Sequence, residues 1–177
     1  MMSSKPLAIL LLLLAGSQLS IAQIKCKLDI DDADAPAHLR TRFGTNVLGV
    51  LGSGWKITLK QTGDKYLWSM QVKWNIHFTD PIGQGQLIYL KLANGNLLQL
   101  AADKDYRPTY SLYPGNVIVS NYLPGGDLSE NDIKLLSESP LANIKITISG
   151  QDIEPQISVT QGRNVMNTAL CLMKPAN

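Results

Sequence analysis

Few residues in this sequence are suited to metal binding or to nucleophilic catalysis. Among 177 residues only two are histidine, His38 and His77, and only two are cysteine, Cys26 and Cys171. A structural zinc site needs four cysteine or histidine ligands, and here the two histidines are isolated in the sequence. The Gly-x-Ser-x-Gly pattern that surrounds the nucleophile of many hydrolases is also absent. The sequence therefore indicates no catalytic residue, no metal site and no cofactor site.

The chain also lacks a marked excess of either charge. It has 16 lysines and arginines against 14 aspartates and glutamates, and loss of the leader described below would remove Lys5 and leave 15 against 14. Proteins that bind nucleic acid or an anionic membrane surface usually have a clear basic excess. We therefore expect neither of these partners.

A single apolar run near the start has the features of a secretory signal. Lys5 precedes the unbroken apolar run 7–15, and Ser20-Ile21-Ala22 then provides the small-x-small pattern that signal peptidase cleaves. The run is about half of the ~20 residues needed to cross a bilayer, which favours a cleaved signal over an anchored helix. Lys25 rather than a small residue precedes Cys26, so a bacterial lipid anchor is not expected.

These features define the expected organisation of the chain. We predict a signal peptide over residues 1–22, with cleavage after Ala22, and one β-rich domain over residues 23–177. No later segment is long and apolar enough to span a membrane, so the mature chain is expected to be soluble. The predicted location is the periplasm or the cell exterior. About 155 residues suffice for one domain with a sizeable core.

The two cysteines lie near the two ends of the predicted domain. In an oxidising compartment Cys26 and Cys171 can form a disulfide that joins those ends. Closing so long a loop restricts the unfolded chain by about 4–5 kcal/mol in the entropy model. The alternative is two buried thiols, because the apolar residues around Cys171 would suit a small buried side chain by packing alone.

An acidic stretch follows the first predicted strand, which is expected over residues 23–30. A calcium-binding loop that began at Asp29 would need glycine at its sixth position and glutamate at its twelfth, where the sequence has Asp34 and Arg40. A solvated acidic turn is therefore expected rather than a cation site.

A glycine-rich segment, residues 43–54, invites comparison with phosphate-binding loops. Its glycines at 49, 52 and 54 do not follow the order of the dinucleotide-binding pattern, and a strand rather than a helix is predicted after them. We expect a flexible loop here.

Alternation of apolar and polar residues predicts the central strands. One strand is expected over 55–60 and a long one over 66–78, whose apolar stripe (Tyr66, Trp68, Met70, Val72, Trp74, Ile76, Phe78) should face the core rather than act as a stacking platform. A strand of that length would span roughly 40 Å, so a bulge or bend is expected in it. His77 falls on the polar face of this strand.

The dipeptide Asn94-Gly95 predicts a hairpin between strands over 86–93 and 96–102, with Leu92 opposite Leu97. Apolar residues on both faces suggest that this hairpin lies well inside the sheet. Residues 103–114 contain Tyr106, Tyr110 and Tyr113, and are expected to form a surface crossing with partly buried rings; an adhesive tyrosine loop is the alternative.

The last third of the chain predicts two helices and further strands. Strands are expected over 116–122 and 144–148, and a returning strand is expected to begin with Ile157 and Val159. Ser129 and Asp132 approximate a capping box that starts a helix ending before Pro140. A second helix is predicted from Arg163 to Lys174, with Val165, Ala169 and Leu172 on its buried face.

Together these elements predict an α+β fold dominated by β-structure. We expect one strongly twisted antiparallel sheet, either open or folded over as a sandwich, with the two late helices covering one face or one end. A small closed β-barrel is the alternative.

The second half of the chain resembles small exported proteins of unknown function from Bacteroidota. The matching features are the Lys91-Leu-Ala-Asn-Gly95 hairpin, the helix with an acidic start over 129–140 and the strand 143–147. This resemblance implies a compartment and a fold, and it implies no functional residue.

The leading functional hypothesis is an exported, non-catalytic module that binds a protein or a glycan. One alternative is an inhibitor or immunity-type protein that docks on a protein partner by an edge strand or by the tyrosine loop. The other is a small secreted hydrolase, whose catalytic histidine would have to be His38 or His77.

Overall fold

A computed structural model describes Cys26, the backbone of residues 41–48, and residues 54–155 and 157–174. The predicted signal peptide with its cleavage site at Ala22, the acidic turn and His38 lie outside the described residues. The same holds for the first predicted strand, apart from Cys26.

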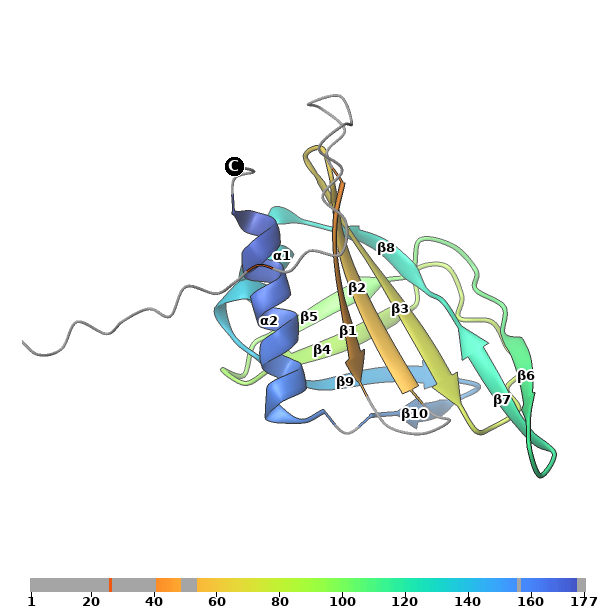
Figure 1. The fold of residues 1–177 in the computed structure, drawn as a ribbon. Helices are drawn as coiled ribbons and strands as arrows, with labels where there is room; N and C mark the ends of the chain where they lie inside the picture. Colours follow the sequence, from red (N-terminus) through yellow and green to blue (C-terminus); the bar gives the residue numbers. More distant parts are fainter. Residues whose placement is uncertain (1–25, 27–40, 49–53, 156, 175–177) are drawn as a thin grey trace, which may run out of the picture.

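Two antiparallel sheets pack face to face (Figure 1). The first has the order β1 (Thr41–Leu48), β2 (Gly54–Thr62), β3 (Lys65–Trp74), β7 (Val117–Tyr122) and β6 (Thr109–Tyr113), and β8 (Gly125–Leu128) also pairs with β3. The second has the order β10 (Gln151–Ile153), β9 (Leu141–Ile148), β4 (Leu87–Leu92) and β5 (Leu97–Ala101). The fold is thus β-rich α+β. The described strands form two separate sheets rather than a closed barrel. The prediction of one continuous sheet was therefore wrong, whereas the layered sandwich arrangement that it allowed is present.

The hydrophobic core lies between the two sheets. Along each central strand buried side chains alternate with more exposed ones, as expected when one sheet face packs on another. Burying each such side chain favours folding by about 1.5–3 kcal/mol. The inward-facing residues of the central strands are Trp55, Ile57, Leu59, Trp68, Met70 and Val72 from the first sheet, and Ile88, Leu90, Leu92, Leu98, Leu100, Ile144, Ile146 and Ile148 from the second.

The long aromatic strand is shorter than its alternation predicted. Strand β3 ends at Trp74, and the chain bends at residues 75–76 before Phe78 returns to the core. The predicted inward face is confirmed, since Trp68 is 3% exposed and packs in the core. Of the predicted stripe, Trp68, Met70, Val72 and Phe78 are buried, and Tyr66 and Trp74 are partly buried against the core. Ile76, at the bend, is 41% exposed, so the prediction was wrong for this residue.

The Asn94-Gly95 hairpin is confirmed, but its register differs by one residue from the prediction. Lys91 rather than Leu92 pairs with Leu97. The Leu92 amide also donates to the Asn96 carbonyl at 2.8 Å, which leaves the three residues 93–95 in the loop. Only Gly95 takes a positive φ, of 91°, in agreement with a three-residue loop that ends in a left-handed glycine. The expectation that this hairpin lies well inside the sheet was also wrong, because β5 is an edge strand.

Two segments predicted as irregular are strands. Residues 43–48, expected to be loop, belong to β1, which pairs with β2 from Thr41↔Thr62 to Leu48↔Trp55. Residues 109–113, expected to be a surface crossing, form β6. In both cases pairing with a neighbouring strand satisfies the backbone hydrogen bonds, and this tertiary effect outweighs a weak local signal.

Both predicted helices are present. Helix α1 (Glu130–Glu138) begins with the predicted capping box, in which the Ser129 hydroxyl accepts from the Asp132 amide at 3.1 Å and the Asp132 carboxylate accepts from the Ser129 amide at 2.9 Å. Helix α2 (Val159–Met173) begins four residues earlier than predicted, because Ser158 and Gln161 form a second capping box. The returning strand is therefore β10, and the strand predicted from Ile157 and Val159 was wrong.

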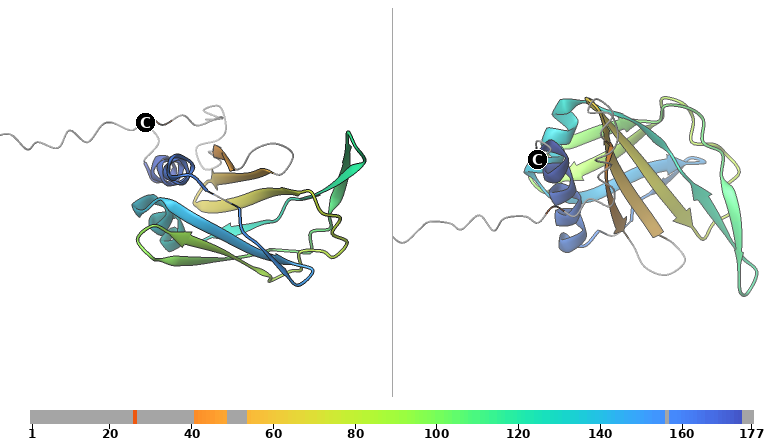
Figure 2. Two further views of the ribbon diagram at one scale, coloured as in Figure 1. Left: turned by 90° about the horizontal axis from the view of Figure 1, so that it is seen from below. Right: turned by 45° about the horizontal axis from the view of Figure 1, so that its top comes forward.

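The helices lie together at one end of the sandwich, where α2 runs along β1 and packs on β9 (Figures 1 and 2). Gly162 allows this close approach, since a Cβ atom at that position would lie 2.0 Å from the Leu141 carbonyl oxygen. The hairpin of β6 and β7 projects at the opposite end. Neither described helix combines the length and the apolar character needed to cross a bilayer.

Candidate docking surface

Among the strands of the first sheet whose side chains the structure describes, the β6–β7 hairpin is the most exposed. Its strands pair from Thr109↔Asn121 to Tyr113↔Val117. Gly115 and Asn116 close the turn with φ values of 83° and 59°, a conformation that glycine and asparagine tolerate best. Every residue of β6 is exposed, and the hairpin extends away from the body of the sandwich (Figure 2).

Apolar side chains gather on this hairpin. Of the ten large apolar side chains that the described residues leave exposed, five belong to it, and Ile76 and Leu123 lie at its base. Leu112 is the most exposed of the ten, at 71%. Such a cluster on one element marks an interaction site more often than scattered single residues do. We call the five hairpin residues the hairpin patch: Tyr110, Leu112, Tyr113, Val117 and Ile118.

The patch covers both faces of the hairpin. Leu112 pairs with Ile118 on one face, and Tyr113 pairs with Val117 on the other. A partner can therefore contact apolar side chains on either side of the strand pair.

Strand β6 itself contains no charge, no proline and no bulge, although Pro108 and Pro114 flank it. No charged residue occurs between Arg107 and Asp127, although 17% of the chain is charged. Edge strands commonly carry charges, a proline or a bulge, or are covered by another element, because their unpaired N–H and C=O groups can pair with a further strand. By contrast, the edge strand β1 has α2 beside it, and β10 has only three residues and carries Asp152.

Side-chain hydrogen bonds hold the base of the hairpin rigidly. The fully buried Ser120 donates from its Oγ to the Ile76 carbonyl at 2.7 Å and accepts from the Phe78 amide at 2.9 Å. The Tyr110 hydroxyl donates to the Phe78 carbonyl at 2.9 Å, and the Tyr122 hydroxyl donates to the Asp80 carbonyl at 2.7 Å. The segment that leaves β3 is thereby attached to the hairpin.

Burial raises the pKa of Tyr122 to about 12, so its hydroxyl remains a proton donor over the physiological range. The hydrogen bond from Tyr122 to the Asp80 carbonyl is therefore kept over the physiological pH range.

The three tyrosines of the segment 103–114 occupy different places. Tyr110 and Tyr113 lie on the hairpin, whereas Tyr106 packs against the core and forms an isolated bridge with Ile82. The Tyr106 hydroxyl donates to an Asp103 carboxylate oxygen at 2.5 Å. Burial and this hydrogen bond raise the pKa of Tyr106 to about 12. The prediction of a partly buried ring is thus confirmed for Tyr106. Tyr110 and Tyr113 are exposed, which agrees better with the alternative of an adhesive tyrosine segment.

His77 belongs to the base of the hairpin. Its ring meets the ring of Tyr110 edge to face, with centroids 4.8 Å apart. Within the described residues no three histidine, cysteine, aspartate or glutamate side chains come together in a way that could hold a metal ion.

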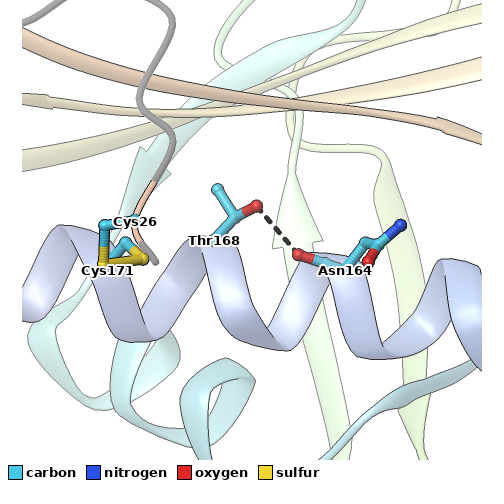
Figure 3. The surroundings of a disulfide bond; sticks show 4 residues. All are labelled: Cys26, Asn164, Thr168 and Cys171. Atoms are coloured by element: carbon cyan, nitrogen blue, oxygen red, sulfur yellow. Dashed lines mark hydrogen bonds between the residues drawn. A yellow bond between two sulfur atoms is a disulfide. The ribbon is translucent and has the colours of Figure 1, made fainter. Parts of the chain in front are cut away.

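The structure joins Cys26 and Cys171 by a disulfide, with Cα atoms 5.4 Å apart (Figure 3). Cys171 is buried on the last turns of α2, whereas Cys26 is exposed. One helical turn before Cys171, the Thr168 hydroxyl donates to the Asn164 carbonyl at 2.8 Å. The bond attaches the start of the predicted mature chain to the last helix, as the spacing of the two cysteines predicted.

Comparisons with protein-family models, curated proteins and solved structures find no match to this chain. The resemblance to exported Bacteroidota proteins therefore stays a prediction, and the function is argued from the surface alone.

Proposed function

We propose that this protein is an exported, non-catalytic interaction module that docks on a partner protein through the β6–β7 hairpin. The observation that carries the proposal is the combination of an open, uncharged edge strand with the exposed hairpin patch. Export is supported by the leader-like sequence of residues 1–22 and by the disulfide, a bond typical of oxidising compartments.

The edge strand favours a polypeptide partner over a lipid surface. An extended segment of another protein can add to β6 and satisfy its free backbone groups, while the patch supplies apolar contacts. In lipid those backbone groups would stay unpaired at a cost of several kcal/mol each. The flanking charges, Arg107 and Asp127, have opposite signs and give no net attraction to an anionic membrane.

The inhibitor or immunity-type alternative would use the same hairpin and differs only in the identity of its partner. A hydrolase has less support, because the one described histidine, His77, contacts a tyrosine ring at the hairpin base.

The proposal is tested by affinity isolation from the envelope and medium of the protein's own host. The double variant Leu112→Asp/Ile118→Asp places charges in the patch, and Val159→Asp is the matched control, since Val159 is 68% exposed on α2. We expect a protein that co-purifies with the wild-type chain and the control, and binds the double variant at least about 100-fold more weakly when both are purified.

Co-purification that is equal for all three forms, or none for any, would contradict the proposal. A dimer of this chain that only the double variant disrupts would assign the hairpin to self-association instead. Both positions are exposed, but residues 112 and 118 face each other across the strand pair, so the two aspartates should lower the free energy of unfolding by about 1 kcal/mol. The thermal midpoint serves as the folding control, and a single cooperative transition shows that the double variant is folded.

A further inference from the structure

The outer face of the second sheet contains a groove that the docking proposal does not use. It has a volume of about 470 Å³ and crosses all four strands, β10, β9, β4 and β5. The side chains that form it come from the outward positions of these strands, opposite the buried isoleucines and leucines of the core.

The middle of the groove is apolar. Tyr89 lies on the central strand β4, half-buried between Lys145 of β9 and Gln99 of β5. Leu97 of β5 is 54% exposed and adds aliphatic surface beside it. An aromatic ring next to an exposed aliphatic side chain can cover one apolar face of a ligand.

Polar side chains at one side of the groove are already ordered by mutual contacts. Lys145 Nζ lies 2.6 Å from Asp152 Oδ2, and the Thr147 hydroxyl donates to Asp152 Oδ1 at 2.7 Å. The hydrogen bonds from Lys145 and Thr147 lower the pKa of Asp152, so this carboxylate stays ionised at neutral pH. Asn143 Nδ2 donates to Glu154 Oε2 at 2.8 Å, and these contacts fix both carboxylates before any ligand arrives.

The groove as a whole is electrically balanced. It is lined by two ammonium groups, from Lys91 and Lys145, and by two carboxylates, from Asp152 and Glu154, so its formal charges cancel. An anionic ligand would meet the carboxylates, and a purely apolar ligand would desolvate all four charges without replacing their hydrogen bonds.

We infer that this groove binds a neutral, polyhydroxylated ligand, namely a saccharide chain. Neighbouring hydroxyls of a sugar ring can donate to the Asp152 and Glu154 carboxylates and accept from the lysines, while the C–H face of the ring lies on Tyr89. The open groove across four strands suits a chain of sugars better than an enclosed small molecule. This site is separate from the hairpin, and its occupancy does not depend on the proposed protein partner.

Nuclear magnetic resonance of the ¹⁵N-labelled chain tests the inference, with maltohexaose, cellohexaose and chitohexaose as probes at up to about 10 mM. We expect at least one probe to cause saturable shifts in amides of β9, β4 and β10, and none in β6. Tyr89→Ala and Asp152→Asn should each weaken that binding by about tenfold. Val159→Ala, at an exposed position on α2 outside the groove, should leave it unchanged.

If loss of the Tyr89 ring disturbs the sheet, Asp152→Asn still tests the site. Asp152 is exposed and asparagine has nearly the shape of aspartate, so this variant should keep the spectrum of the folded protein. The absence of saturable shifts with all three probes would overturn the inference. Shifts confined to residues outside the groove, or shifts unaffected by Asp152→Asn, would overturn it as well. The double variant Leu112→Asp/Ile118→Asp should bind the saccharide normally, so that failure of the docking proposal and failure of the saccharide site can be told apart.

Discussion

Reduction of the disulfide between Cys26 and Cys171 should lower the free energy of unfolding by about 5 kcal/mol. The two cysteines are separated by 145 positions, so the bond closes a loop that contains most of the chain. In the chain-entropy model a loop of this length reduces the entropy of the unfolded state by about 17 cal/mol/K, which gives about 5 kcal/mol at 25 °C. For a domain of this size we expect the thermal midpoint to fall by about 10–20 °C.

Differential scanning calorimetry with and without a phosphine reductant measures this effect, and the mass gain of two hydrogen atoms confirms reduction. The variant Cys26→Ser provides a matched control, because Cys26 is exposed and its replacement removes the bond with little loss of packing. We expect the variant to unfold at the midpoint of the reduced wild-type protein and to be insensitive to reductant. Equal midpoints for oxidised and reduced wild-type protein would refute this reasoning.

Three further variants test the packing and the hairpin base by urea denaturation. Gly126→Ala should destabilise the protein by about 1–3 kcal/mol, because its Cβ would lie 2.6 Å from the Ala101 carbonyl oxygen, whereas Gly54→Ala, with open space around it, should have little effect. Ser120→Ala should cost about 1–2 kcal/mol, because it removes both hydrogen bonds of a buried hydroxyl while the Phe78 amide and the Ile76 carbonyl keep their mutual bond at 3.1 Å; a neutral result would contradict the role of Ser120 at the hairpin base. The pKa of Tyr122 is raised from 10.0 to about 12, so its contribution to stability is full below pH 10 and is lost as the pH rises through 12. Tyr122→Phe should therefore be less stable at neutral pH and should lose less stability than the wild-type protein over that alkaline range.

The elements that the sequence predicted well have local signals. The alternation of Trp68, Met70 and Val72 defines an inward face without knowledge of the neighbouring strands. The contacts of Ser129 with Asp132 form within one helical turn, so the start of α1 follows from four consecutive residues. The disulfide was predicted from the expected oxidising compartment and from the positions of the two cysteines. Two separate buried thiols were the alternative, and the structure, which joins Cys26 to Cys171, favours the disulfide.

The elements that were missed depend on pairing and tertiary contacts that their own sequence pattern does not show. Strand β6 exists because β7 pairs with it and because Ser120 and Tyr122 attach the pair to residues 76–80, contacts that span more than forty positions. The sequence did contain one usable signal for this surface, the uncharged stretch between Arg107 and Asp127. The groove could not be predicted, because its side chains meet only after four strands of the second sheet have paired.

Photo-crosslinking in the protein's own host tests the docking proposal most directly. A benzoylphenylalanine side chain replaces Leu112 in the hairpin patch or, as a control, the similarly exposed Val159 on α2. The account predicts a discrete protein adduct from position 112 that is absent from position 159 and disappears when Ile118→Asp is added. Equal adducts from both positions, or no protein adduct from position 112, would contradict the assignment of the β6–β7 hairpin as the docking surface.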